Sequence, residues 1–154
     1  MRLSPEMRPA NDSSRKYVRV DEAGRAYATG GRKKASAQVW VWPCADGESK
    51  IIVNGMSLAG FLGGHWERRL DVMSPFTETG TVGLFSVNAV VRGGGPGGQA
   101  GAVRHGIATA MQGLDFMLRP TLRSAGFLTR DPRRRERKKP GQKGARAKFA
   151  WVKR

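Results

Sequence analysis

A glycine-rich segment carries the sharpest chemical signal in the chain. Gly93, Gly95 and Gly98 have the GxGxxG spacing of a dinucleotide-binding loop, between a predicted strand and a predicted helix. No room follows for a parallel strand ending in a ribose-binding acid, and no Gly-Lys-Ser/Thr is present, so neither a dinucleotide site nor a Walker A loop is favoured. Glycines still let a backbone approach a phosphate closely, and a helix starting near Gln99 presents free N–H groups. With Arg92 and Arg104 nearby, the sequence predicts a binding site for a nucleic-acid phosphate. The alternative is a flexible loop that only joins the strand to the helix.

The single cysteine and the two histidines form no pattern that predicts catalysis. Cys44 is the only cysteine, which excludes an internal disulfide and a multi-cysteine zinc site. The only histidines are His65 and His105, and no acid or nucleophile is placed near His105 by any pattern. We interpret His105 as a histidine on a helix surface beside Arg104. We therefore expect no enzymatic activity, no metal site, no cofactor and no small-molecule substrate.

The charge of the chain predicts a polyanion as its partner. The 154 residues carry a formal net charge of +16. Residues 130–154 hold twelve basic and two acidic residues, a net charge of +10, with prolines and glycines that interrupt regular structure. We expect this segment to be an extended tail that orders only against negative charge, although a solvated tail or a nuclear-import signal is the alternative. No apolar run is long enough to span a membrane, so no membrane partner is expected.

The elements that must position these residues alternate in a way typical of an α+β fold. Period-two patterns predict strands over 34–42, 50–53 and 82–92, and a short strand over 70–73 before Pro75. Asn54-Gly55 predicts a turn. Helices are predicted over 57–62, 99–112 and 120–126, the second with an apolar stripe at helical spacing. The sequence thus predicts a small mixed sheet with helices packed on one face, followed by the basic tail.

Three stretches read together resemble one family. They are Tyr27 to Ala37 (YATGGRKKASA), Gly93 to Ala108 (GGGPGGQAGAVRHGIA), and Leu128 to Arg133 (LTRDPR) continuing into Glu136 to Gly141 (ERKKPG). With the final Lys153-Arg154, they are similar to ribosomal protein nine of the small subunit, over roughly residues 21–154. Two departures are that Val152 stands where bacterial members usually have serine, and that Gly31 stands where a basic residue is common.

The resemblance implies a fold, a place and a set of contacts. It implies the fold of the second domain of ribosomal protein five, seated on rRNA in the small-subunit head beside neighbouring head proteins. It implies a tail that threads through rRNA and reaches the anticodon stem-loop of the peptidyl-site tRNA, where Lys153 and Arg154 would contact phosphates. Apart from the resemblance, we expect Trp151 to stack on a base or a ribose. The residues expected to bind rRNA are Arg32, Lys33, Lys34, Arg92, Gly93, Gly94, Gly95, Gly97, Gly98, Gln99, Arg104, His105, Arg130, Arg133, Arg134, Arg135, Arg137, Lys138, Lys139, Lys143, Arg146 and Lys148.

The resulting prediction is a structural protein of the small ribosomal subunit with three segments. Residues 1–20 form an N-terminal extension with the look of a presequence remnant, residues 21–129 the rRNA-binding domain, and residues 130–154 the tail. The Trp-Val-Lys-Arg ending and the lead-in from Asp21 are similar to mitochondrial members, which places the protein in the mitochondrial matrix, the alternative being a bacterial cytoplasm. The alternative function is a general nucleic-acid-binding basic protein outside the ribosome.

Overall fold

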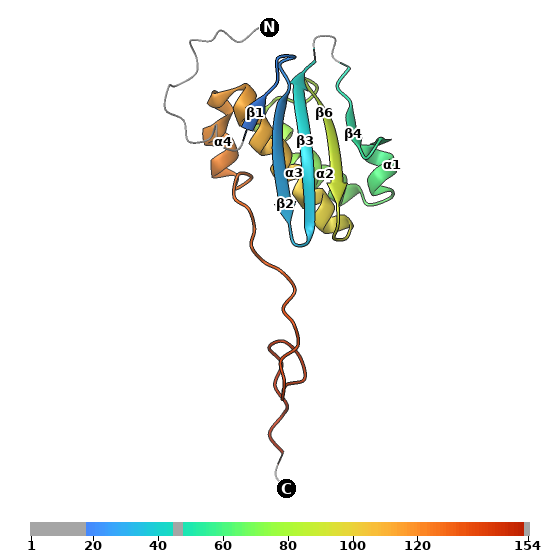
Figure 1. Ribbon diagram of the computed structural model, residues 1–154, viewed down its shortest axis with the longest axis vertical. Helices are drawn as coiled ribbons and strands as arrows, with labels where there is room; N and C mark the ends of the chain where they lie inside the picture. Colours follow the sequence, from blue (N-terminus) through green and yellow to red (C-terminus); the bar gives the residue numbers. More distant parts are fainter. Residues whose placement is uncertain (1–17, 45–47, 153–154) are drawn as a thin grey trace.

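The computed structural model describes residues 18–44 and 48–152 and confirms an α+β fold (Figure 1). Residues 1–17 of the predicted N-terminal extension, residues 45–47, and Lys153 and Arg154 lie outside the described residues. The elements in chain order are β1 (Val18–Val20), β2 (Ala26–Arg32), β3 (Ala35–Pro43), β4 (Ile51–Val53), β5 (Met56–Ser57), α1 (Leu58–Leu62), α2 (Trp66–Thr79), β6 (Phe85–Arg92), α3 (Pro96–Leu114), the short 3-10 helix η3 (Phe116–Leu118) and α4 (Arg119–Ser124).

The six strands form one mixed sheet in the order β1-β2-β3-β6-β4-β5. Neighbouring strands are antiparallel except β4 and β6, which run parallel. Alternate residues of β3, from Ala35 to Val41, and of β6, from Val87 to Val91, are buried on one face, as the period-two patterns predicted. α2 and α3 cover that face, and Figure 1 shows the helices behind the sheet. The core therefore lies between the sheet and one layer of helices.

Glycines allow α3 to pack directly against the sheet. A Cβ atom at Gly30 of β2 would lie 2.0 Å from the Ala102 carbonyl oxygen, and one at Gly106 would lie 2.5 Å from Val39 Cγ2. No side chain fits between strand and helix at these two points. Ile107 and Met111 then fill the core from the predicted apolar stripe, and both are fully buried. The helix begins at Pro96, three residues earlier than predicted, because proline suits the first turn of a helix.

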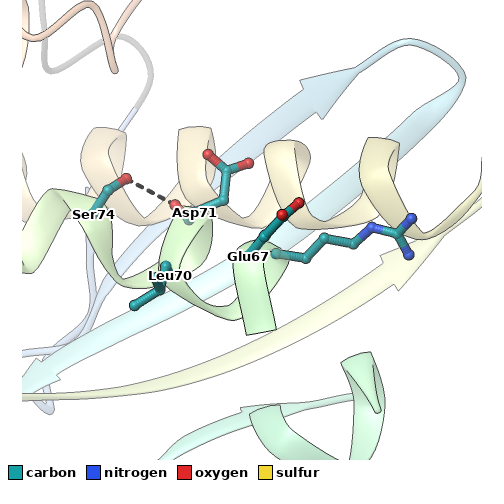
Figure 2. Close-up of a pocket in the computed structure, with 5 residues that line it drawn as sticks. Glu67, Leu70, Asp71 and Ser74 are labelled. Carbon is teal, nitrogen blue, oxygen red and sulfur yellow. Dashed lines mark hydrogen bonds between the residues drawn. The ribbon is translucent and has the colours of Figure 1, made fainter. Parts of the chain in front are cut away.

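Two predictions about the sheet were incomplete or wrong. β1 and β2 were not predicted as strands, because Ala26–Arg32 contains two adjacent glycines and lacks the usual β-branched residues. Residues 70–73, predicted as a short strand ending before Pro75, lie inside α2. Proline lacks an N–H and leaves the Asp71 carbonyl without its helical donor, but the Ser74 hydroxyl donates to that carbonyl at 2.8 Å (Figure 2). The helix continues past Pro75 and ends at Gly80, whose φ is 65°.

The predicted helix cap at Ser57 and the predicted turn at Asn54-Gly55 are confirmed. The strand predicted over 82–92 begins at Phe85, and the helix predicted over 120–126 spans Arg119–Ser124. Ser57 caps α1, since its side chain accepts a hydrogen bond from the Gly60 N–H at 3.2 Å. Asn54 and Gly55 form the turn between β4 and β5 with φ angles of 52° and 79°. The Asn54 side chain also extends the parallel pairing with β6: its Nδ2 donates to the Val91 carbonyl at 3.1 Å, and its Oδ1 accepts from the Val91 N–H at 2.8 Å.

Residues 130–152 contain neither helix nor strand and run away from the sheet in Figure 1. None of the described helices is long and apolar enough to cross a membrane.

Candidate nucleic-acid interface

Basic residues from two separate stretches meet at one end of the sheet, the lower end in Figure 1. Lys33 and Lys34 form the turn between β2 and β3, and both are exposed. Arg92 ends β6 opposite Ser36 of β3, so it emerges beside that turn. A Cβ atom at Gly93 would lie only 2.8 Å from the Lys34 carbonyl oxygen. We call this surface the basic end; it consists of Arg32, Lys33, Lys34, Arg92 and residues 93–98.

The backbone of the Lys33–Lys34 turn has a conformation that residues other than glycine rarely adopt. Lys33 has a φ of 54°, in the left-handed region that costs a non-glycine residue about 1–2 kcal/mol. Both lysines are exposed and make no ion pair with another residue in the described ranges 18–44 and 48–152. The turn thus holds two adjacent cations at the tip of the hairpin, available to an external anion.

Close packing against neighbouring backbone atoms explains Gly93 and Gly94 of the loop at residues 93–98. Gly93 and Gly94 have φ angles of 71° and 68°, and a Cβ atom at Gly94 would lie 3.0 Å from the Ala35 N. In the first turn of α3, the N–H groups of Gly98 and Gln99 donate to the Gly95 carbonyl at 2.8 and 2.9 Å. Within the described part of the chain, the Gly97 N–H is the one first-turn amide left without an acceptor. The loop therefore offers one free backbone N–H group to a phosphate. The helix start predicted near Gln99 implied more than one such group.

Arg104 does not stand free beside the loop, as the predicted phosphate-binding site required. Its guanidinium forms an ion pair with Asp71 of α2. The same guanidinium lies 5.4 Å from the centre of the Phe127 ring, within the range of a cation–π contact. Arg104 thus ties α3 both to α2 and to the segment that leads into the tail.

His105 also faces the protein rather than solvent, in contrast to the predicted helix-surface histidine. The Gly31 N–H donates to His105 Nδ1 at 3.4 Å, so Nδ1 must be unprotonated. Nε2 then carries the hydrogen and donates to the Leu128 carbonyl at 3.3 Å. Burial lowers the pKa of His105, and the nearby positive charges of Arg130 and Arg104 lower it further, against an opposing effect of the Leu128 contact. The ring is a neutral bridge between β2 and the start of the tail.

The tail is fastened to the basic end where it leaves the domain. Arg32 Nη1 lies 2.8 Å from Asp131 Oδ2, and both side chains are mostly buried. Arg133 donates to the same carboxylate from Nε at 3.0 Å and from Nη2 at 2.7 Å, and its backbone N–H donates at 2.9 Å. These hydrogen bonds from Arg133, together with the charge of Arg32, hold the pKa of Asp131 far below its ordinary value. Arg130 packs its guanidinium against Gly31.

The described cationic residues further along the tail, beyond Arg133, are all exposed. Arg146 Nη2 lies 2.6 Å from Glu136 Oε1, and this ion pair closes a loop of the tail around Pro140 and Gly141. Trp151 is 94% exposed. Lys153 and Arg154, predicted to contact tRNA, lie outside the described residues. The exposed basic residues beyond Arg133 are Arg134, Arg135, Arg137, Lys138, Lys139, Lys143, Arg146 and Lys148.

A model of the ribosomal protein S9/S16 family matches residues 30–154, which include the basic end and the whole tail. The chain belongs to this family. The predicted membership of this ribosomal protein family is therefore confirmed. The small ribosomal subunit protein uS9m of Arabidopsis thaliana is 44% identical over 154 residues, covering 99% of this chain and 35% of the relative. The chain thus spans about a third of the length of this relative.

The hollow on α2 in this S9/S16 domain has no catalytic arrangement. It is lined by Glu67, Arg68, Leu70, Asp71 and Ser74. Figure 2 labels four of them, Glu67, Leu70, Asp71 and Ser74, on α2. Its Asp71 carboxylate is engaged by Arg104, and its Ser74 hydroxyl is engaged by the helix backbone. In residues 18–44 and 48–152, no group of three or more histidine, cysteine or carboxylate side chains is placed to hold a metal ion.

Sequence reasoning missed the acidic partners that organise the S9/S16 site. Asp131 and Asp71 were not predicted to fix Arg32 and Arg104, and Gly31 was noted only as a departure from the family. Asp131 did carry a signal, because it is a single acid in the basic run Arg130 to Arg135. Such a carboxylate is well placed to pair locally, but nothing in the sequence names Arg32 as its partner.

Proposed function

We propose that this chain is a structural protein of the small subunit of the mitochondrial ribosome. The basic end and the tail would bind small-subunit rRNA, and the last residues would reach the peptidyl-site tRNA. We propose the same three segments as before: an extension over 1–20, an rRNA-binding domain over 21–129 and a tail over 130–154. The compartment rests on the Arabidopsis thaliana relative, whose name is that of a mitochondrial small-subunit protein.

One observation carries the proposal: the tail leaves the domain at its basic end. The Arg32–Asp131 ion pair places the first tail residues beside Lys33, Lys34 and Arg92. The free cations of the domain and those of the tail are then continuous along one path. A nucleic acid bound at the basic end would meet the tail without a gap in positive charge.

The mechanism of such a protein is binding rather than turnover. Lysine and arginine release counterions from the RNA backbone, an effect that weakens steeply as salt rises. The tail would lose conformational entropy when it docks on the RNA during assembly of the subunit. Most of the fixed contacts would be to phosphates, and specificity would come from RNA shape rather than base edges. Trp151, which is almost fully exposed, would stack on a base or a ribose.

A general polyanion binder is the second candidate, favoured by the net charge of +16 alone. It predicts equal binding to duplex DNA and to structured RNA of similar charge. A protein whose cations are held in a fixed arrangement would instead prefer small-subunit rRNA. This preference would survive raised salt, because only cations that match phosphate positions still contribute to binding at raised salt.

The proposal is tested with the purified chain and a transcript of small-subunit rRNA. The dissociation constant is measured over a series of salt concentrations for the wild type, for Lys33→Ala/Lys34→Ala, and for the control Lys50→Ala, since Lys50 already pairs with Glu48. We expect the double variant to lower the slope of log K against log salt by about 1.5, which is two phosphate contacts. An unchanged slope would remove the basic end from the interface. Equal affinity for duplex DNA would favour the general binder.

A further inference from the structure

The face of the sheet opposite the helices is uncovered by any described element. Figure 1 shows this face toward the viewer, with no helix across β2, β3 or β6. Strand alternation puts Tyr27 and Thr29 of β2, Gln38, Trp40 and Trp42 of β3, and Asn88 and Val90 of β6 on it. We call these seven residues the open face. Their partners on the other side of each strand are buried beneath α2 and α3.

Aromatic rings lie in a registered row across the open face. Tyr27 pairs with Trp40, and Trp40 pairs with Asn88 on the far side. The Tyr27 and Trp40 ring centres are 5.1 Å apart with planes tilted by 46°. Trp42 follows on the same side of β3. Three large rings on two adjacent strands form a platform wider than one ring, half-exposed and unoccupied by other described residues.

Uncharged hydrogen-bonding groups surround the rings. Thr29 pairs in register with Gln38, and Asn88 lies beside Trp40. All three are exposed, and across the described stretches none of their side chains is hydrogen-bonded to another residue. An amide and a hydroxyl in such positions can donate to and accept from the edge of a planar ligand that stacks on the rings.

The charge on this side of the sheet favours an anionic ligand. Among the described strand residues that point to this side, the charged ones are Arg19 beside Tyr27 and Arg92 opposite Ser36, both basic and exposed. Two carboxylates in described loops at the ends of these strands, Asp21 and Glu48, pair with Arg25 and Lys50. Arg92 also belongs to the basic end, so the open face is continuous with the proposed phosphate-binding surface.

We propose that the open face is a stacking platform for unpaired RNA bases, with Trp40 and Tyr27 as the stacking residues. It rests on the proposed function only in taking RNA as the ligand, and it adds a second surface to the basic end and the tail. A sheet that carries aromatic residues on adjacent strands is a known geometry for binding single-stranded bases. Stacking tolerates any base, while Gln38, Thr29 and Asn88 supply polar contacts to the base edge.

The test compares two nucleic acids that share phosphates but differ in exposed bases. The full chain is titrated with short oligouridine and with duplex DNA, at salt high enough to weaken tail contacts. We expect Trp40→Leu to weaken oligouridine binding about ten-fold and to leave duplex binding unchanged. The control Trp66→Leu removes a tryptophan that is 60% exposed on α2, and should change neither. Wild-type affinity of Trp40→Leu for oligouridine would overturn the proposal.

A second variant keeps the test decisive if Trp40→Leu fails to fold. Gln38→Glu places a carboxylate on the exposed part of the open face, and Thr77→Glu places the same charge on the exposed side of α2 as a control. Gln38→Glu should weaken oligouridine binding at least as much, and Thr77→Glu should not. A different outcome would assign the open face to a protein partner and overturn the proposal. In that outcome, Gln38→Glu and Thr77→Glu bind oligouridine equally well, but Gln38→Glu loses a crosslink to another protein of the small subunit. Failure of wild-type chain to bind rRNA would refute the proposed function separately.

Discussion

Arg32, the last residue of β2, and Asp131, the second residue of the tail, form an ion pair at 2.8 Å. This contact decides where the tail starts its path. Asp131 accepts from Arg133 as well, so one carboxylate holds one arginine of the domain and one of the tail. The tail direction is therefore set at its root, although its later residues have no regular structure.

Replacing Asp131 by Asn should loosen the root of the tail without unfolding the domain. The charge that attracts Arg32 and Arg133 disappears, whereas the core between sheet and helices is untouched. We expect faster trypsin cleavage after Arg130 and Arg133 and an unchanged thermal midpoint for the domain. Glu136→Gln is the matched control, since it removes the Arg146 pair further along the tail. Equal protection at Arg130 in wild type and Asp131→Asn would show that the ion pair does not anchor the tail.

Asn54 should contribute measurably to stability through its side chain. Its amide completes the pairing of β4 with β6 by satisfying both the N–H and the carbonyl of Val91. Asn54→Gly removes these bonds but still accepts the φ of 52°. We expect a loss of about 1–3 kcal/mol in the free energy of unfolding, measured by denaturant titration. Asn54→Ala should lose more, because it adds left-handed strain. A change within experimental error for Asn54→Gly would contradict this role.

The contact between β2 and α3 should not tolerate a methyl group. A Cβ atom at Gly30 would meet the Ala102 carbonyl oxygen at 2.0 Å, so Gly30→Ala requires the helix to move. We expect a loss of about 1–3 kcal/mol in the free energy of unfolding, or more. Gly64→Ala is the control, since nothing lies within 4 Å of its Cβ position. Equal stability of both variants would mean that strand and helix are not packed this closely.

His105 should make the stability of the domain depend on pH. Its pKa is lowered in the folded state, so the unfolded chain, with a value near 6.5, binds the proton more readily. The free energy of unfolding should therefore fall as pH drops below about 6.5 and level off below the folded pKa. Denaturant titrations across this range should show the fall in the wild type and a smaller one in His105→Gln. The reverse slope would mean that the ring is protonated in the folded protein.

The sequence predicted elements that rest on local periodicity, and missed those that depend on distant partners. The β3 and β6 strands alternate cleanly between apolar and polar residues, and the stripe from Val103 to Met111 is buried as expected. β2 was missed because its glycines are needed by α3, which lies 70 residues further on. Pro75 suggested an end to regular structure, yet the neighbouring Ser74 hydroxyl compensates for it.

The candidate site was predicted in composition but not in arrangement. The cationic side chains of the basic end were named from charge and from resemblance to the family. Their grouping follows from strand register, which places Arg92 opposite Ser36 beside the Lys33–Lys34 turn. Arg104 and His105 were expected to face RNA, but an acid on α2 and the carbonyl of Leu128 hold them. Sequence periodicity predicts which face of a helix is buried, but it does not predict which residues of other elements contact that helix.

Sedimentation tests the central claim most directly. A tagged copy of the full chain is expressed in cells, and mitochondria are lysed gently and separated on a sucrose gradient before and after a moderate salt wash. The account predicts co-migration with the small ribosomal subunit in both gradients, because a structural protein holds its rRNA through many fixed contacts. Protein at the top of the gradient, or complete release by the wash, would contradict the account.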